Sequence, residues 1–571
     1  MATPKPDVQL EDEDITRLDL IDSEELPPVF RQGSLRSRSS GSQSVLSLTL
    51  DPDLLRGVSA AAALSGWCKH WSPKTKATNV HHLSRPVHSI DTFLSHDWET
   101  SRWTKLMTLL MVLNSRASAV AGLLTSILVG ILRITHILPD ETWTVCFVYI
   151  ALFGVLCFWQ RIRSLFPGHQ MVFLDKLCIN QMDSEKKQQG ILGLGAFVLR
   201  SKKLLVLWSP RYFTRMWCTY EIGCFLSHGQ TSRQIEILPV KLALILIPTA
   251  LLWHSLMIGF HLLRGGFVRS LEEVTPSGIL YVGSAMLLLA SSLLPMVNYL
   301  GMSMMREVQE LPRQLENFEV QKAECFCCTH HHRHPQTGEE MICDRELIYE
   351  TLEELYHSKP GEDALSGFNR RVQERLRPKV LRRIGGEFPL RYVVSMVLVS
   401  NLPFLSELIS KLNKGPPVLL DGFGQAIFAL RLILLWVQPC LSMLFSLKFS
   451  QWIWGIFNFK SSVCLAIWTS PLISLAVACT WISMEVMIFV TPDNSMLPIL
   501  AFLAVFALDT YLYVDIFDIF KKSTGRQPEP SFRDTPPSTE VGDASLAVDV
   551  DLVCDKWEIE EDGDTMVTWK F

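Results

Sequence analysis

Long apolar stretches without formal charge recur along the chain and are its most prominent pattern. A helix needs about 20 apolar residues to cross a bilayer, and runs close to that length predict membrane spans. The two weakest runs, the first and the fifth in chain order, fit buried helices of a soluble domain equally well. Taken together, the runs predict an α-helical polytopic membrane protein with about eight spans: Ala117–Leu132, Trp143–Trp159, Leu242–Leu263, Val274–Met305, Tyr392–Leu405, Leu432–Leu447, Val463–Met484 and Asn494–Leu508.

The basic residues between these runs predict the orientation of the chain. Lys and Arg follow the second, fourth, sixth and eighth runs, whereas the connector Pro139–Glu141 between the first two runs has neither. Because cytosolic loops carry an excess of Lys and Arg, an even number of spans puts both termini in the cytosol. We therefore expect an integral, multi-pass membrane protein in contact with membrane lipids. The sequence does not identify which membrane holds it.

The composition agrees with a chain that lies partly in lipid. Hydrophobic residues make up 48% of the 571 positions and charged residues only 19%. Soluble proteins carry roughly 25% charged residues, so the composition argues against a purely soluble enzyme. The net charge of −5 is too weak to favour nucleic acid as a partner.

The polar regions divide the rest of the chain into segments. An N-terminal arm over residues 1–50 and an acidic tail over 523–571 have compositions typical of disorder. Between them, the pattern predicts a transmembrane hairpin over 242–305, a cytosolic Cys/His-containing helical region over 306–386 and a four-span transmembrane bundle over 388–514.

Residues 85–240 alternate between short apolar runs typical of strands and amphipathic helical stretches such as Ser101–Asn114. This alternation predicts a cytosolic α/β domain with a doubly wound parallel sheet. A transmembrane hairpin at about 117–160 interrupts the domain, and its two crossings return the chain to the same side of the membrane. The strands are expected at Ser89–Ser95, Met171–Leu174, Leu204–Trp208 and Ile235–Val240.

Polar residues follow directly on three of the expected strands. Because parallel α/β sheets bind ligands at the carboxyl ends of their strands, these residues are candidates for lining a binding site. They are Ser95, His96 and Asp97 after the first strand, Asp175 and Lys176 after the second, and Ser209 after the third.

Three of these segments resemble the Toll/interleukin-1 receptor (TIR) domain. Asp91–His96 resembles the family's first motif, and Phe173–Lys176 resembles its second strand and the loop that follows. The most specific match is Leu205–Pro210 followed by Trp217-Cys-Thr-Tyr-Glu221, which is similar to a strand, a Ser-Pro turn and the family's Trp-Cys-x-x-Glu. The chain departs from the family in the inserted hairpin, and in the membrane span that begins at Leu242 where a further strand and helix are expected.

The resemblance implies a TIR-like domain with a candidate activity. In enzymatic members of the family, the Glu of this motif is the catalytic residue of NAD⁺ cleavage, and that role would fall on Glu221. Trp217 and the six strand-end residues would then surround NAD as the substrate. On a helix, Trp217 and Phe225 share the face of Glu221, and a partly desolvated carboxylate is typical of functional sites. The alternatives are a domain that only self-associates, and a Glu221 that bonds to a neighbouring loop.

A cluster of four Cys and four His between Cys325 and Cys343 is a second candidate site. Structural zinc takes four Cys or His ligands in a tetrahedron. The expected ligands are Cys325, Cys328, His330 and Cys343. Palmitoylation of the cysteines and a cluster without a ligand are the alternatives.

Two classes of function fit these features. The first is signalling by self-association through the TIR-like domain, with NAD⁺ hydrolysis as its candidate activity. The second is a transporter or channel-like membrane protein whose α/β domain is regulatory and non-catalytic. The two differ in whether activity needs Glu221 or the last four spans.

Overall fold

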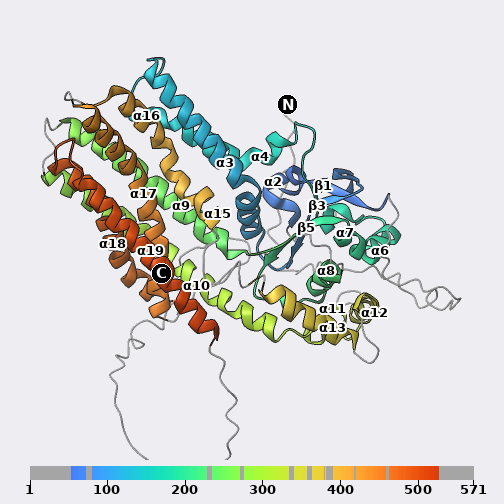
Figure 1. Ribbon diagram of the computed structural model, residues 1–571. Helices are drawn as coiled ribbons and strands as arrows, with labels where there is room; N and C mark the ends of the chain where they lie inside the picture. The colour runs from blue at the N-terminus through green and yellow to red at the C-terminus, as the bar shows by residue number, and fades with distance from the viewer. Residues whose placement is uncertain are drawn as a thin grey trace, which may run out of the picture.

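The computed structural model of the protein describes residues 53–525, except for 72–79, 228–233, 271–275, 334–337, 339, 342, 357–362, 379, 381–389, 417–419 and 458–461. The N-terminal arm over 1–50 and residues 526–571 of the acidic tail lie outside the described residues. The described chain forms an α/β part around one sheet and a bundle of long helices beside it (Figure 1).

Seven helices are long and apolar enough to cross a membrane, which suggests an integral multi-pass membrane protein. The eighth run of the sequence corresponds to a shorter apolar stretch, Leu497–Leu512, at the start of α19 (Leu497–Gly525). The seven are α3 (Arg102–Ile134), η3 with α4 (Thr142–Val145 and Cys146–Arg163), α9 (Lys241–Ser270), α10 (Pro276–Glu316), the segment Leu390–Lys414, α17 (Gly422–Ile456) and α18 (Val463–Val490).

The fifth of these spans is not a regular α-helix. It consists of α15 (Leu390–Tyr392), a π-helical turn η7 (Val393–Val397), a 3₁₀ segment η8 (Leu398–Phe404) and α16 (Leu405–Lys414). Pro403 lies in η8 and has no N–H to donate. The buried Asn401 side chain donates to the Trp436 carbonyl of α17 at 2.5 Å. Irregular backbone at membrane depth is tolerated where neighbouring helices bury it in this way.

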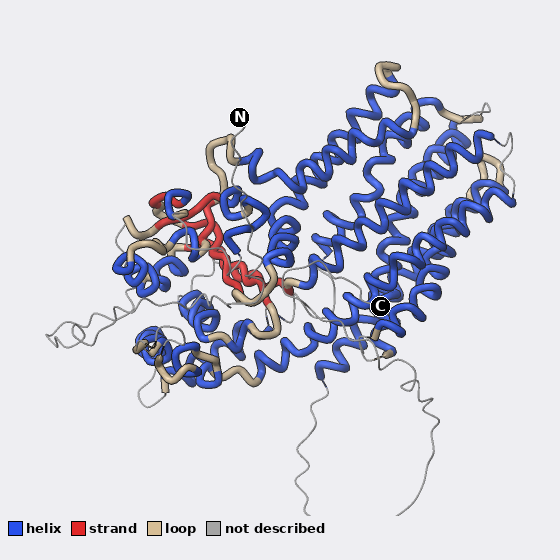
Figure 2. The backbone as a smooth tube through the Cα atoms, turned by 180° about the vertical axis from the view of Figure 1, so that it is seen from behind, coloured by secondary structure: helices blue, strands red, loops and turns tan. Residues whose placement is uncertain are grey.

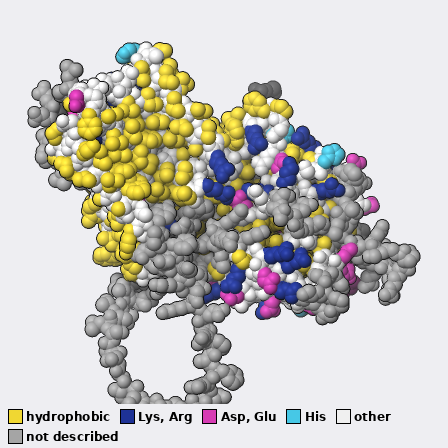
Figure 3. All heavy atoms as spheres, in the orientation of Figure 1, with side chains coloured by type: hydrophobic (Ala, Val, Ile, Leu, Met, Phe, Trp, Pro, Cys, Tyr) yellow, Lys and Arg dark blue, Asp and Glu magenta, His cyan; other side chains and the backbone are white. Residues whose placement is uncertain are grey.

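Apolar side chains cover the outer surface of the helix bundle, whereas charged side chains gather over the α/β part (Figure 3). On the bundle, Leu124, Trp468 and Phe506 are 61%, 81% and 53% exposed. Apolar patches of this extent are unfavourable in water, so lipid is the environment that explains this surface.

A six-stranded sheet in the order β2-β1-β4-β3-β5-β6 forms the centre of the α/β part. Neighbouring strands among β3 to β6 are parallel, and these four strands arise from the segments where the sequence predicts strands. β1 and β2 pair antiparallel, which makes the sheet mostly parallel instead of wholly parallel. Both are short and lack the apolar run by which a buried strand is recognised. The strands are β1 (Arg56–Ser59), β2 (Ser84–Pro86), β3 (Ile90–His96), β4 (Met171–Phe173), β5 (Ser201–Trp208) and β6 (Gln234–Pro239).

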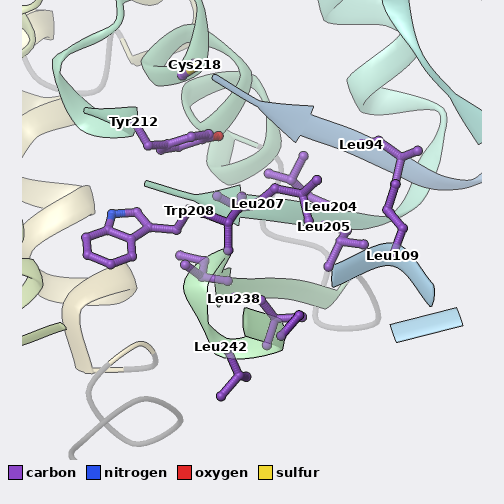
Figure 4. Close-up of a cluster of buried hydrophobic side chains, with 14 of the residues drawn as sticks. Leu94, Leu109, Leu204, Leu205, Leu207, Trp208, Tyr212, Cys218, Leu238 and Leu242 are labelled. Atoms are coloured by element: carbon purple, nitrogen blue, oxygen red, sulfur yellow. The ribbon is translucent and has the colours of Figure 1, made fainter. Parts of the chain in front are cut away.

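Buried apolar side chains from the strands and from α3 and α8 form one core (Figure 4). Leu106 and Leu109 of α3 belong to this core, and α3 then continues unbroken into the first span. The predicted helix Ser101–Asn114 and the first predicted span are therefore one helix, because no Gly or Pro separates them. The other short helices here are α1 (Ala60–Ala63), α2 (Ser65–Cys68), η1 (Lys69–Trp71), η2 (His81–Leu83), α5 (Asp175–Cys178), α6 (Ser184–Leu192), α7 (Leu194–Leu199), η4 (Tyr212–Thr214) and α8 (Met216–Ser227).

The region after the fourth span packs against α8. The Tyr356 hydroxyl donates to the Gly223 carbonyl of α8 at 2.7 Å. A Cβ at Gly223 would lie 2.7 Å from the Leu352 side chain, so glycine permits this close approach. Figure 2 shows these helices below the sheet, joined to the bundle through α10. They are η5 (Val320–Lys322), α11 (Phe326–Thr329), α12 (Asp344–Tyr356), α13 (Ala364–Arg371) and the π-helical turn η6 (Val372–Leu376).

Candidate functional site

The order of the parallel strands creates a crevice beyond the carboxyl ends of β3 and β5. The chain passes from β3 to β4 on one side and then to β5 on the other side of β3. Ligands of doubly wound sheets bind outside the strand ends at such a reversal. Since β3 ends at His96 and β5 at Trp208, the polar residues that follow these strands meet at this point.

A pocket of about 140 Å³ opens at this edge of the sheet. It is lined by five of the residues that the sequence singled out: His96, Asp97, Asp175, Trp217 and Glu221.

The other three predicted residues contact the lining of this pocket. The Ser95 hydroxyl donates to the Glu221 carboxylate, and the Ser209 hydroxyl donates to Asp97 at 3.3 Å. The Lys176 ammonium lies 5.6 Å from the centre of the Trp98 ring, which also lines the pocket. The structure thus brings all eight strand-end and motif residues to one place.

Glu221 lies at the end of a chain of hydroxyl groups. Ser95 Oγ donates to the Glu221 carboxylate and lies 2.5 Å from the Tyr212 hydroxyl. Because Ser95 has one hydroxyl proton and gives it to Glu221, Tyr212 must be the donor to Ser95. Burial raises the pKa of Tyr212 well above its usual value, so the phenol keeps the proton that this arrangement needs. The chain holds the Glu221 carboxylate in one orientation.

The surroundings of Glu221 favour its protonated form. Burial raises the pKa of Glu221 to about 8, the Ser95 hydrogen bond opposes that rise, and the nearby Asp175 carboxyl adds to it. Both protonation states of Glu221 are therefore accessible near neutral pH. Such a perturbed carboxyl in a pocket is a candidate functional group with a physical cause.

His96 supplies the pocket with a neutral imidazole. Its ring centre lies 4.7 Å from that of Trp71 and 4.6 Å from that of Trp98. Burial holds the pKa of His96 well below its usual value. Among the described residues, neither ring nitrogen has a hydrogen bond of normal geometry. The imidazole therefore holds one donor and one acceptor, both buried, that no described residue uses in a hydrogen bond of normal geometry.

Several charged residues at this site were not predicted from the sequence. Lys105 of α3 is fully buried, its ammonium donates to the Trp98 carbonyl at 3.3 Å, and its charge acts on Asp97 and Asp175. A lysine on the apolar, sheet-facing side of a helix was the signal that would have revealed it. Three further charged residues that were not predicted line the pocket itself: Lys187, Arg215 and Asp344.

The Cys/His cluster forms a second candidate site, which could bind a metal such as zinc. The thiols of Cys325, Cys327 and Cys328 lie within 4.8 Å of one another, and Cys327, His332 and Cys343 form a second group of the same kind. The Cys328 and Cys343 sulfurs are 3.7 Å apart, which connects the two groups.

The structure brings three of the four predicted metal ligands into the cluster and places the fourth, His330, at a backbone carbonyl. Cys325, Cys328 and Cys343 lie in the cluster, whereas the His330 Nδ1 atom lies 3.0 Å from the Phe326 carbonyl. His332 belongs to the cluster instead, because the chain reverses at His331 and His332, both with positive φ. A run of three histidines does not reveal in sequence which of them turns back.

Comparison with known protein families finds no match for this chain, and comparisons with curated proteins and with solved structures find none either. The resemblance to the TIR family therefore rests on the motifs quoted above, and the function must be argued from the site.

Proposed function

We propose that this protein is a multi-pass membrane protein whose cytosolic TIR-like domain cleaves NAD⁺ and signals by self-association. One observation carries the catalytic part of the proposal. The Glu221 carboxylate of the Trp-Cys-x-x-Glu motif lines a pocket at the strand reversal and accepts a hydrogen bond from Ser95. Taken in chain order, the four parallel strands also have the spatial order second, first, third, fourth, which is that of one doubly wound class.

The pocket offers groups that suit the hydrolysis of a nicotinamide–ribose bond. The bond between the nicotinamide nitrogen and ribose C1′ breaks, and its electron pair leaves with nicotinamide. A water oxygen bonds to C1′, which gives ADP-ribose and releases one proton. Positive charge develops on the ribose as the bond breaks, and an ionised Glu221 stabilises it. Ser95 and Tyr212 act as positioning residues that keep the carboxylate aimed.

The size of the pocket limits which part of the dinucleotide enters. Its volume of about 140 Å³ is below the roughly 300–1,000 Å³ of sites that enclose a whole ligand. The nicotinamide riboside end would therefore enter, between the aromatic rings of Trp98 and Trp217. Arg215 and Lys187, which also line the pocket, carry the charge that a pyrophosphate needs.

The direct test is NAD⁺ consumption by the purified full-length protein in detergent, followed by chromatography of nicotinamide. Glu221→Gln is expected to lower turnover roughly 100-fold or more, the size typical of losing one electrostatic stabiliser. Glu185→Gln is the matched control, because Glu185 is exposed on α6. Equal turnover in wild type and Glu221→Gln, or none in either, would contradict the catalytic proposal.

Self-association rests on the family resemblance and is tested separately. Cross-linking of the protein in lipid bilayers is expected to give dimers or larger assemblies, equally for wild type and Glu221→Gln. A protein that stays monomeric in bilayers at every density would contradict this part and leave the catalytic part standing.

A different observation favours the transporter or channel alternative. A cavity of about 60 Å³ inside the helix bundle is lined by Asn401 and Glu407 of the irregular span and by His261 of α9. The His261 Nδ1 atom lies 3.4 Å from the Glu407 carboxylate. Charged groups at membrane depth often mark the path of an ion or solute. Ion flux through liposomes that Glu407→Gln abolishes and Glu221→Gln does not would favour this alternative.

A further inference from the structure

The Cys/His cluster is attached directly to the start of the helix that carries Glu221. The Glu324 N–H donates to the Thr214 carbonyl at 2.5 Å, and the Met216 N–H donates to the Glu324 carbonyl at 3.1 Å. Met216 is the first residue of α8, and Glu324 directly precedes the first cysteine of the cluster. The backbone before the cluster therefore pairs with the backbone that leads into α8.

Asp344 forms a second link between the cluster and the pocket. Its backbone N–H donates to the Cys327 sulfur at 3.3 Å, and its carboxylate accepts the indole N–H of Trp217 at 3.2 Å. Asp344 is 3% exposed and lines the Glu221 pocket together with Trp217. One residue thus connects a cluster sulfur with an aromatic wall of the pocket.

The sulfur positions fit a tetrahedral metal centre. Zn–S bonds of about 2.3 Å at tetrahedral angles place sulfurs about 3.8 Å apart. The Cys328 and Cys343 sulfurs are 3.7 Å apart, and those of Cys327 and Cys328 are 4.0 Å apart. Cys325 lies closer, 3.1 Å from the Cys327 sulfur, than two ligands of one zinc ion are expected to lie.

The backbone at His331 and His332 brings a fourth donor, the His332 imidazole, within 4.8 Å of the Cys327 and Cys343 sulfurs. Their φ angles are 52° and 57°, a left-handed region that residues other than glycine occupy only at a free-energy cost. The turn is held by the His332 N–H, which donates to the Cys327 carbonyl at 2.7 Å. A metal bond to the imidazole would offset the cost of this conformation.

The cluster is also open to ions from solution. His332 and Cys343 line a groove of about 720 Å³ on the surface. A metal site needs such an entry path as well as suitable donors and supporting hydrogen bonds. The Asp344 N–H to sulfur bond is a supporting bond of that kind.

We propose that Cys327, Cys328, His332 and Cys343 bind one zinc ion, and that this ion holds the Trp217 wall of the Glu221 pocket in place. The three thiols lose their protons as the Zn–S bonds form, and a neutral imidazole supplies the fourth ligand. Zinc then fixes the positions of Cys327 and Cys343. Asp344, which bonds to the Cys327 sulfur through its N–H and to the Trp217 indole through its carboxylate, is held in place as well and orients Trp217. The metal ligation stands on its own; that the pocket takes NAD⁺ rests on the proposed function.

The first measurement is the metal content of the full-length protein purified in detergent with zinc present. We expect one zinc ion per chain, and its loss in Cys343→Ser and His332→Ala. His330→Ala and Cys325→Ser are the matched controls and are expected to keep the metal. Absence of zinc in the wild type, or loss of zinc in His330→Ala with retention in His332→Ala, would overturn the proposed ligand set.

The second measurement is amide hydrogen exchange over residues 211–227, before and after a chelator removes zinc. Removal of zinc is expected to speed amide exchange at the start of α8 roughly tenfold. This is the change expected when local opening becomes easier by about the contribution of one hydrogen bond. Asp344→Ala should keep the zinc but show the faster exchange without any chelator. Unchanged exchange after zinc removal would overturn the link to the pocket. Neither measurement uses NAD⁺, so a failed activity assay would leave both interpretable.

Discussion

Glu221 combines solvent contact through a pocket with a strongly perturbed carboxyl group. Surface carboxylates of helices normally stay ionised at neutral pH. Here burial raises the pKa to about 8, and the hydroxyl of Ser95 is one group that limits the rise. The packing of α8 therefore sets the pKa of Glu221, and that pKa sets the pH range in which the proposed reaction can run.

The pH dependence of activity tests this connection. Because only the ionised carboxylate stabilises a cationic transition state, kcat/KM for NAD⁺ is expected to rise with pH, with a midpoint near 8. Ser95→Ala removes a bond to the ionised form, so the pKa of Glu221 rises and the midpoint moves to higher pH. Tyr212→Phe should shift it in the same direction but less, because it acts through Ser95. A pH profile that is flat between 6 and 9 or unmoved by Ser95→Ala would contradict this role.

The pocket residues at the ends of strands could be predicted from the sequence, because an apolar run locates a strand end within a residue or two. His96, Asp97 and Asp175 are of this kind. The sequence did not reveal Tyr212 and Asp344, which reach the site from a turn and from a helix more than a hundred residues away from β3 and which no local pattern marks. The predicted metal ligands include His330, whereas the structure brings His332 near the thiols. Backbone reversal by two non-glycine residues has no signature in sequence.

At the scale of elements, the α/β part and the helix bundle are connected directly, with little linker between them. α3 runs from the sheet into the first span, and α9 begins two residues after β6 ends. The length of an uncharged run predicted where the seven long apolar helices lie, and the eighth run corresponds to a shorter apolar stretch. Run length did not predict that a sheet-covering helix and a span are one element, because the apolar pattern of both is similar.

The hairpin of α3 and α4 depends on a close approach at Gly122. A Cβ there would lie 2.4 Å from a methyl carbon of Leu152, which is itself buried. Gly122→Ala is therefore expected to destabilise the hairpin by about 1–3 kcal/mol, measured as a lower midpoint of thermal unfolding in detergent. Gly154→Ala in α4 is the control, since no atom in the described part of the chain lies within 4 Å of the Cβ that alanine would add there. Alanine is the better helix former, so this control should unfold at the same or a higher temperature. An equal drop in the unfolding midpoint of both variants would contradict the proposed role of the close approach at Gly122.

A buried ion pair joins the last strand to the fifth span. Glu236 of β6 is 4% exposed, accepts a hydrogen bond from the Tyr392 hydroxyl at 3.0 Å, and pairs with Lys203 at 2.5 Å and with Arg391. Glu236→Gln removes the charge that Lys203, Arg391 and the Tyr392 hydroxyl share, and the side chains of Lys203 and Arg391 are 29% and 41% exposed. Because hydrogen bonds to a charged group contribute about 1.5–3 kcal/mol, we expect a loss of up to about 3 kcal/mol in unfolding free energy.

The neighbouring strand pair Asp91–Lys202 offers a matched control for Glu236. It is also a carboxylate–lysine contact, at 2.8 Å, but its side chains are 35% and 66% exposed. Exposed pairs contribute less than about 1 kcal/mol, so Asp91→Asn should lower the unfolding midpoint far less than Glu236→Gln. Similar shifts of the unfolding midpoint for both variants would show that the Glu236 contacts do not stabilise the junction between the sheet and the bundle.

At the scale of the whole molecule, the sheet lies at one end of α3, and the loop that follows α3 lies at the far end, beside α16 (Figure 1). A cluster of charged side chains lies in this loop region. In that cluster Asp140, in the connector after α3, pairs with Arg133 at 3.5 Å and with Lys414 at the end of α16. The connector between the first two spans and the end of the fifth span therefore share one side. The distribution of basic residues along the sequence predicts the same arrangement, with both segments on the side of the membrane opposite the α/β part.

The number of crossings then depends on α19. Its described apolar stretch, Leu497–Leu512, is about 24 Å long and falls short of a bilayer core of about 30 Å, but the whole helix of 29 residues reaches about 43 Å. α19 packs along α17 and α18, and Lys521 and Lys522 lie near its end. A helix packed in the bundle with basic residues at its end is expected to cross and to end in the cytosol. Protease digestion of sealed vesicles should then remove tags at both termini from the same side, and a tag between residues 415 and 421 only from the other. A C-terminal tag protected together with that internal tag would mean seven crossings, and would place the two ends of the chain on opposite sides.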